Sequence, residues 1–70
     1  MLKKSVYEET NDTYSVTIMV TKDNDCWGIY YRMDDSPFLY AFGISTDYTV
    51  KSVFDLAHAN IPCYLDMFEC

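Results

Sequence analysis

The segment YSVTIMVT, residues 14–21, decides the fold expected for this chain. Large apolar side chains occupy every second position in it, and mostly polar side chains lie between them. A period of two, in a segment rich in β-branched residues, is typical of a strand that buries one face. The buried face of this strand is expected to carry Tyr14, Val16, Ile18 and Val20.

Two further segments with the same period follow at residues 26–33 and 38–44, after acidic turns at residues 22–25 and 34–37. Asp, Asn and Pro favour turns because their side chains fix or tolerate turn geometry. Turns this short predict an antiparallel meander of three strands. One face of this sheet should collect the large side chains of all three strands: Tyr14, Val16, Ile18, Val20, Trp27, Ile29, Tyr31, Met33, Phe38, Tyr40, Phe42 and Ile44.

The period changes after residue 45, where apolar residues follow the i, i+3, i+4, i+7 spacing of an amphipathic helix. Asn60 and Pro62 should end this helix, because the residue before a proline is pushed out of the helical region. Residues 63–70 are compatible with an edge strand or a short helix, and we favour the helix because proline commonly opens one. The helical stripe comprises Val50, Val53, Phe54 and Ala57.

These elements predict an α+β fold in the order β-β-β-α, with the helix packed on the loaded sheet face and a short C-terminal helical element. A chain of 70 residues corresponds to a single domain over residues 1–70. Residues 1–13 are expected to be flexible or to add an extra edge strand. Chains this small are marginally stable, and the 17% aromatic content compensates because each buried ring removes a large area from water.

The charge balance is acidic, with 11 Asp and Glu against 5 Lys and Arg and a net charge of −6. Direct nucleic-acid binding and attachment to an anionic membrane are not expected, because both need a basic surface. The opening sequence has no apolar run typical of a signal peptide, and nothing is long and apolar enough to span a membrane. We therefore expect a cytoplasmic protein with a basic partner.

No set of residues predicts catalysis, a metal site or a cofactor. The lone histidine, His58, lies five residues before Cys63, and a Cys–His pair is the weakest of the functional hypotheses. The cysteines, Cys26, Cys63 and Cys70, lack the spacing of zinc ligands, and their odd number indicates reduced thiols rather than a disulfide framework. The chain is thus expected not to be an enzyme.

The acids should gather at the two ends of the sheet. Asp23, Asp25 and Asp47 would lie where the helix begins, and its positive end favours carboxylates. At the opposite end the helix stops, and its dipole disfavours acids there. A charge that local physics disfavours is the better functional candidate. The acids predicted to bind a partner at this end are Asp34, Asp35, Asp66 and Glu69.

Two tyrosines are predicted to anchor a partner, because tyrosine offers contact area and a polar tip at low entropic cost. Tyr30 should lie on the sheet face opposite the helix, and Tyr64 on the terminal segment. The two glycines, Gly28 and Gly43, belong to the same opposite face and indicate that something packs close to the backbone there.

In size, acidity, tyrosine content and lack of a catalytic constellation, the chain resembles the small phage proteins that inhibit host defence, the anti-CRISPR proteins above all. This resemblance is one of composition. It implies an inhibitor in the bacterial host cell that occupies a basic site of a CRISPR effector or another nucleic-acid-handling complex, with acidic clusters standing in for phosphates.

A second resemblance, over roughly residues 14–66, is to HicB-type antitoxins. The order of a tyrosine-led strand at residues 14–18, an acidic turn at 23–27, the segment at 46–50 and the pair Tyr64-Leu65 is similar to theirs. The glycine and the Glu-Glu-Ala helix start typical of that family are missing here. This alternative implies an acidic partner-binding module that acts as a dimer, so both a monomer and a homodimer remain open.

Overall fold

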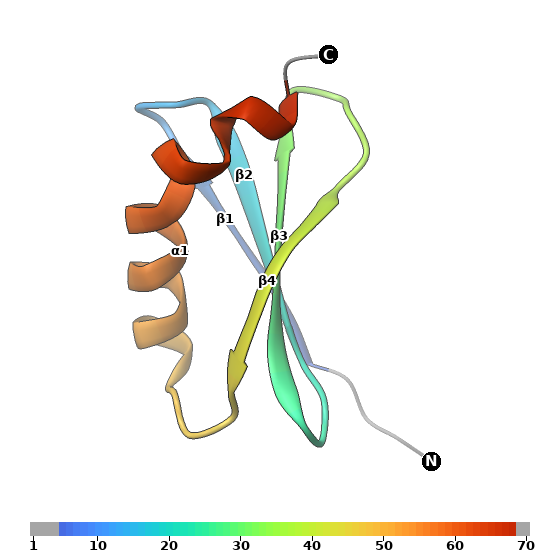
Figure 1. The fold of residues 1–70 in the computed structure, drawn as a ribbon, viewed down its shortest axis with the longest axis vertical. Coiled ribbons are helices and arrows are strands. Elements are labelled where there is room, and N and C mark those ends of the chain that lie inside the picture. Colours follow the sequence, from blue (N-terminus) through green and yellow to red (C-terminus); the bar gives the residue numbers. More distant parts are fainter. Residues whose placement is uncertain (1–4, 69–70) are drawn as a thin grey trace.

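The computed structural model describes residues 5–68, apart from the side chains of residues 67 and 68, and shows one antiparallel sheet with a helix against one face (Figure 1). The strands follow one another in space as they do in sequence, β1-β2-β3-β4. The predicted three-stranded meander is therefore wrong, because the sheet has a fourth strand at its N-terminal edge. The elements are β1 (Ser5–Asn11), β2 (Val16–Lys22), β3 (Cys26–Met33), β4 (Leu39–Ser45), α1 (Val50–Tyr64) and the 3₁₀ turn η1 (Leu65–Phe68).

Strand β1 lacks the apolar alternation of the other strands, which is why its sequence gave only a weak strand signal. All of its residues except Asn11 are exposed. The strand forms nonetheless because it pairs with β2 over its whole length, from Ser5 opposite Lys22 to Asn11 opposite Val16. Backbone pairing, rather than burial of its own side chains, therefore places β1 in the sheet.

Helix α1 begins at a clear N-cap and runs further than the sequence predicts. The Thr49 hydroxyl accepts a hydrogen bond from the Ser52 amide at 3.2 Å, as N-cap residues do. The helix then continues through Pro62 to Tyr64, and η1 follows directly. The predicted helix stop and the separate C-terminal helical element are both wrong, because Ile61 is buried in the core and holds this last turn in place.

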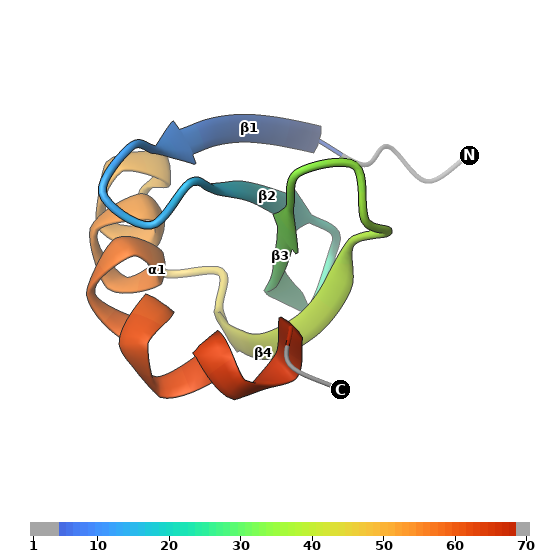
Figure 2. The same cartoon turned by 90° about the horizontal axis from the view of Figure 1, so that it is seen from above.

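The core lies between α1 and the inner face of the sheet, which curls around the helix (Figure 2). Two polar atoms of large aromatic residues find partners within it, as buried polar groups must. Trp27 Nε1 donates to the Tyr48 carbonyl at 2.9 Å, and the Tyr31 hydroxyl donates to the Ala57 carbonyl at 2.6 Å. The core residues are Val16, Ile18, Val20, Trp27, Ile29, Tyr31, Val53, Phe54, Ala57 and Ile61.

A β-bulge in β4 changes which side chains face the helix. Ile29 of β3 pairs with Phe42, whereas the next residue, Tyr30, pairs with Tyr40, so Ala41 is an extra residue on β4. Because one extra residue reverses the alternation beyond it, Tyr40 lies on the outer face. Phe38, two residues before Tyr40, also lies on the outer face, where its ring packs against Arg32. The prediction that Phe38 and Tyr40 share the face of Phe42 and Ile44 is therefore wrong.

Candidate functional site

The outer face of the sheet, turned away from α1, carries a cluster of aromatic side chains. The rings of Tyr30 and Tyr40 meet edge to face, with their centroids 5.4 Å apart. Such a contact stabilises the pair beyond the area it buries. Tyr40 leaves 57% of its surface exposed, which is a large apolar exposure for a side chain on a sheet.

Two glycines form the floor beneath these rings. Gly28 and Gly43 pair directly across β3 and β4. A Cβ atom at Gly43 would lie 2.9 Å from the Tyr40 hydroxyl, and one at Gly28 would lie 3.3 Å from the Tyr30 ring. The expectation that something packs close to the backbone at both glycines is thus confirmed: the Thr21 hydroxyl and the Tyr30 ring lie over Gly28, and the Tyr40 hydroxyl lies over Gly43.

Arg32 extends the aromatic cluster toward the β3–β4 turn. Its guanidinium carbon lies 4.7 Å from the centre of the Phe38 ring, a cation–π arrangement. Its Nε atom is buried and has no hydrogen-bond partner among the described residues. A half-buried arginine stacked on a ring is therefore fixed in place on this face.

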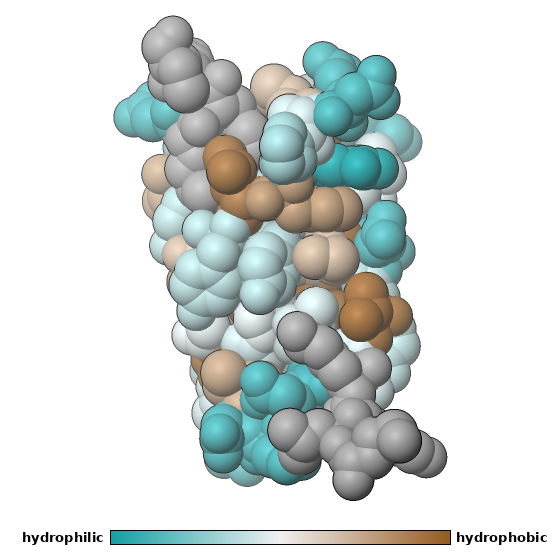
Figure 3. All heavy atoms as spheres, turned by 90° about the vertical axis from the view of Figure 1, so that its right-hand side faces the viewer, coloured by the Kyte–Doolittle hydropathy of each residue, from teal (hydrophilic) through white to brown (hydrophobic). Residues whose placement is uncertain are grey.

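We define the outer aromatic face as Met19, Tyr30, Arg32, Phe38 and Tyr40. Met19 pairs with Tyr30 across β2 and β3, which continues the face toward the N-terminal edge. Figure 3 views this side of the molecule and shows weakly polar and apolar groups across its middle, with strongly hydrophilic groups gathered toward its ends. Tyrosine, phenylalanine, methionine and arginine are the residue types enriched at protein interfaces.

Acidic residues gather at one end of the molecule, as the sequence predicts. The β3–β4 turn carries Asp34 and Asp35, and η1 carries Asp66 at the same end (Figure 1). The β1–β2 turn brings Asp12 there as well, a residue that sequence reasoning missed because β1 was not counted as a strand. We define these four exposed acids as the acidic end. Glu69, which was also predicted there, lies outside the described residues.

Asp34 has a backbone geometry that favours a small polar residue. Its φ angle is 52°, in the left-handed region that Asp and Asn tolerate better than most side chains. The Ser36 amide donates to the Met33 carbonyl at 3.1 Å, and the Ser36 hydroxyl accepts from the Met33 amide at 3.1 Å. The turn is therefore closed by its own backbone and serine, and both carboxylates are left exposed to solvent.

The acids at the opposite end have local structural roles. Asp23 accepts hydrogen bonds from the backbone amides of Asp25 and Cys26, which closes the β2–β3 turn. Asp47 lies in the loop that leads into α1, near the positive end of the helix dipole. This end thus has a reason to be acidic that the end at Asp34 and Asp35 does not share.

Tyr64 does not lie on an outlying surface. Its ring stacks on Phe42 at 5.6 Å and also contacts Tyr31 at 5.7 Å between centroids. It closes one side of the core and is only partly exposed. The structure therefore places Tyr30 on the outer aromatic face and Tyr64 against the core, and it does not bring these two predicted anchors together.

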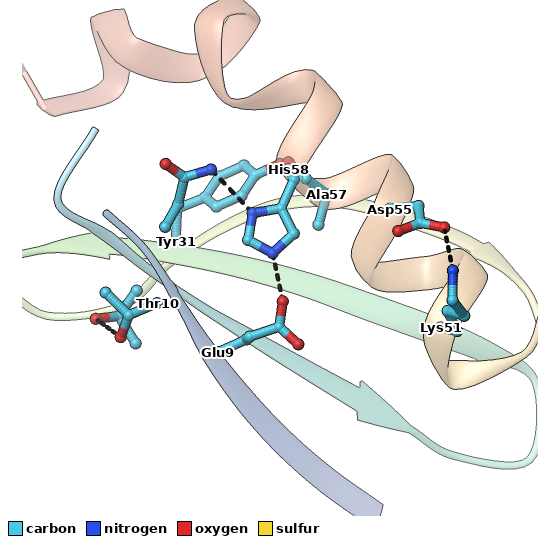
Figure 4. Close-up of polar contacts among 9 residues, drawn as sticks. Glu9, Thr10, Tyr31, Lys51, Asp55, Ala57 and His58 are labelled. Atoms are coloured by element: carbon cyan, nitrogen blue, oxygen red, sulfur yellow. Dashed lines mark hydrogen bonds and ion pairs between the residues drawn. The ribbon is translucent and has the colours of Figure 1, made fainter. Parts of the chain in front are cut away.

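His58 occupies a polar contact between α1 and β1 that the sequence gave no means to foresee (Figure 4). Asn11 Nδ2 donates to His58 Nδ1 at 2.9 Å, which leaves His58 Nε2 to donate to a carboxylate oxygen of Glu9. Both ring nitrogens therefore bond to β1 rather than to Cys63, which is exposed. The role of this cluster is structural: its hydrogen bonds attach the edge strand β1 to helix α1.

The buried hydroxyl of Tyr31 has a strongly raised pKa, but its role is structural. Burial raises the pKa of Tyr31 above its ordinary value, and the nearby ionisable groups of Tyr64 and Cys63 raise it further. The neutral phenol is needed to donate to the Ala57 carbonyl. Within residues 5–68, no three His, Cys, Asp or Glu side chains are grouped so that they could hold a metal ion.

Comparison with protein-family models, with curated proteins and with solved structures finds no match to this chain. Among the described residues, no helix has the length and apolar character needed to cross a membrane.

Proposed function

We propose that this chain is a non-enzymatic binding module that docks its outer aromatic face and the adjoining acidic end on a basic site of a larger protein. The observation that carries the proposal is the outer aromatic face, where the Tyr30 and Tyr40 rings meet and Arg32 stacks on Phe38, with no helix or strand of residues 5–68 packed over them. Exposed aromatic side chains next to a fixed arginine are typical of interface hot spots.

Charge supports a basic partner. Asp34 and Asp35 directly follow the strand that carries Tyr30 and Arg32, so carboxylates border the aromatic cluster at this end. Acids at the rim of an interface steer association with a positively charged surface and select against acidic competitors. The net charge of −6 adds a long-range attraction toward a positively charged partner.

The finer proposal is that the partner is a CRISPR effector or another complex that handles nucleic acid. Proteins of this kind hold nucleic acid in basic channels, where phosphates are the natural ligands. Carboxylates spaced along the acidic end would occupy phosphate positions, and the outer aromatic face would supply apolar contact. The module would then inhibit by denying nucleic acid access to its channel, as the compositional resemblance to anti-CRISPR proteins suggests.

Affinity capture from a bacterial lysate with matched variants tests this proposal. The immobilised wild-type protein is compared with Asp34→Asn/Asp35→Asn and with Tyr30→Ser/Tyr40→Ser, and captured proteins are quantified by mass spectrometry at low and high salt. Asparagine keeps the left-handed geometry at residue 34, so the first variant changes charge rather than turn shape. A partner of the proposed kind is lost from both variants and from wild type at high salt, since charge attraction is screened.

The matched control is Asp25→Asn/Asp47→Asn, which removes the same charge from the opposite end. This control should retain the partner. Adding the nucleic acid that the partner normally binds should release the partner from the immobilised module, because the two compete for one basic site. Equal capture by all four proteins would contradict the proposal. So would loss of the partner with the control variant to the same extent as with Asp34→Asn/Asp35→Asn, because net charge alone would then explain binding.

A further inference from the structure

The two edges of the sheet differ in how well they are protected from pairing with another chain. β1 forms one edge and β4 forms the other. A strand at a sheet edge presents unpaired backbone amides and carbonyls, and proteins usually block such edges with proline, charged side chains (lysine above all), bulges or covering elements. Which of these devices each edge possesses therefore indicates where a partner strand could add.

The β4 edge carries several of these devices. Its bulge at Ala41 interrupts regular pairing, and Pro37 lies shortly before the strand. Tyr64, at the end of α1, stacks on Phe42 of the same strand. An incoming strand would meet an irregular backbone beside the C-terminal part of α1.

Within its described span the β1 edge is protected by acidic side chains alone, Glu8 and Glu9, which oppose an acidic strand but not a basic one. The strand contains no proline and no lysine, and its pairing with β2 runs without a register shift through all seven residues. Beyond this ladder, Tyr7 contacts Trp27 and the pair Glu9 and Asn11 bonds to His58. These contacts hold the strand from its inner side, so its backbone is kept extended and regular.

We propose that β1 accepts an extended segment of a partner protein by strand addition, and that this segment carries basic side chains. Strand addition to an open edge derives affinity from main-chain hydrogen bonds and specificity from alternate side chains. Glu8 is exposed and has no partner among the described residues, so it can face a lysine or arginine across the new pair. This inference goes beyond the proposed function and uses a different surface.

A second copy of this chain fits the edge poorly. The antiparallel register that uses all seven residues of both strands sets Glu8 directly opposite Glu8 of the other copy. Like charges directly opposite each other destabilise a strand pair. Each copy also carries a net charge of −6, which opposes self-association. A basic segment meets neither penalty.

The test uses the full chain labelled with nitrogen-15 and a synthetic seven-residue peptide that alternates lysine with valine and threonine. Amide shifts and hydrogen exchange are followed by NMR as the peptide is added. The expected result is chemical-shift change centred on residues 5–11, with slower amide exchange in that strand. Two control peptides have the same length: one has the same net charge with a central proline, which breaks the ladder, and the other replaces lysine with glutamate.

Glu8→Lys should weaken binding of the lysine peptide about fivefold or more, because an attractive cross-strand pair becomes repulsive. Asp47→Lys makes the same charge change away from the edge and should alter binding by less than about twofold at 150 mM salt. Equal binding of the proline peptide, equal weakening by the two lysine variants, or shifts located outside β1 would each overturn the inference.

Sedimentation and a variant of the outer aromatic face complete the test. A dimer at micromolar concentration that Glu8→Lys dissociates would also overturn the inference, because the edge would then be occupied by a second copy. Tyr30→Ser/Tyr40→Ser should bind the lysine peptide as the wild type does, since it leaves β1 untouched. Failure of the peptide with intact lysate capture refutes only strand addition, whereas the reverse outcome refutes only the proposed function.

Discussion

On the inner face of the sheet Ile18, Ile29 and Tyr31 are fully buried beneath α1, whereas on the outer face Tyr40 leaves 57% of its surface exposed. Both faces are rich in large side chains, so apolarity alone does not determine which face is covered. The difference lies in what packs on each: the inner face has α1, and the outer face has two tyrosine rings laid over a pair of glycines. The comparison teaches that large side chains become a stabilising core only where an element packs over them, and that on the outer face they stay partly exposed.

The largest expected effect is a difference in stability loss between two adjacent residues of β2 that lie on opposite faces of the sheet. Ile18→Ala should lower the free energy of unfolding by about 2–5 kcal/mol, because it leaves a cavity in a fully buried site. Met19→Ala, one residue further along β2 and on the outer face, should cost about 1 kcal/mol or less. Urea unfolding followed by tryptophan fluorescence measures both. Equal losses for the two variants would break the distinction between the faces.

Gly43→Ala tests the packing of the outer face itself. A Cβ atom there would lie 2.9 Å from the Tyr40 hydroxyl and 3.2 Å from the Trp27 carbonyl oxygen, so the ring must move. We expect a loss of about 1–2 kcal/mol, the usual cost of a mild overpacking. In a Tyr40→Ala background the loss should be smaller, which a double-mutant cycle by thermal unfolding detects. An unchanged loss would show that Tyr40 does not lie over Gly43.

Tyr31→Phe tests the polar contact inside the inner face. The variant loses the hydrogen bond to the Ala57 carbonyl and should be less stable by about 1 kcal/mol at neutral pH.

The same variant should change the alkaline limit of stability. Because the folded-state pKa of Tyr31 is raised, the unfolded chain ionises this phenol first, and wild-type stability falls as pH rises above about 10. Tyr31→Phe should lose less stability over that range, measured by urea unfolding between neutral pH and pH 11. Parallel pH profiles for the two proteins would contradict the assignment.

The smallest expected effect is at the boundary between the inner face and β1. Asn11→Ala removes the donor to His58 and the acceptor of the Tyr14 amide, two partly exposed hydrogen bonds. We expect a loss of about 0.5 kcal/mol, because water replaces part of these bonds. Hydrogen exchange should quicken in β1 more than in β2 and β3. Uniformly faster amide exchange across the sheet would mean that the Asn11–His58 contact does not stabilise β1 separately from the other strands.

The sequence predicted those parts of the fold in which local pattern and burial agree. The small α+β domain is confirmed, and the residues predicted to face inward from β2 and β3 are buried except the half-buried Met33, although Thr21 and Gly28 on the opposite face are buried as well. β1 was missed as a firm strand because its pairing with β2 is a long-range contact that leaves no apolar pattern in SVYEETN. The helix stop was misplaced because burial of Ile61 outweighs the local effect of Pro62.

The candidate site was predictable in part for the same reason. The gathering of Asp34, Asp35 and Asp66 at one end follows from turn positions and strand direction, which the sequence specifies. The outer placement of Phe38 and Tyr40 follows from one extra residue at Ala41, and nothing in the local pattern marks that bulge. Tyr64 was assigned to the surface because the helix was expected to end before it.

The bulge in β4 also bears on how such a surface could arise. If Ala41 paired as a regular strand residue instead of forming the bulge, the alternation of FLYAFGIS would turn Tyr40 and Phe38 toward the helix, beside Phe42 and Ile44. The same sequence could therefore present these two aromatic side chains to the interior or to the outside, depending only on whether β4 pairs with β3 with or without the bulge at Ala41. Gain or loss of an exposed aromatic surface in this fold therefore needs only a one-residue shift in strand register, with no change in the amino acids that form the surface.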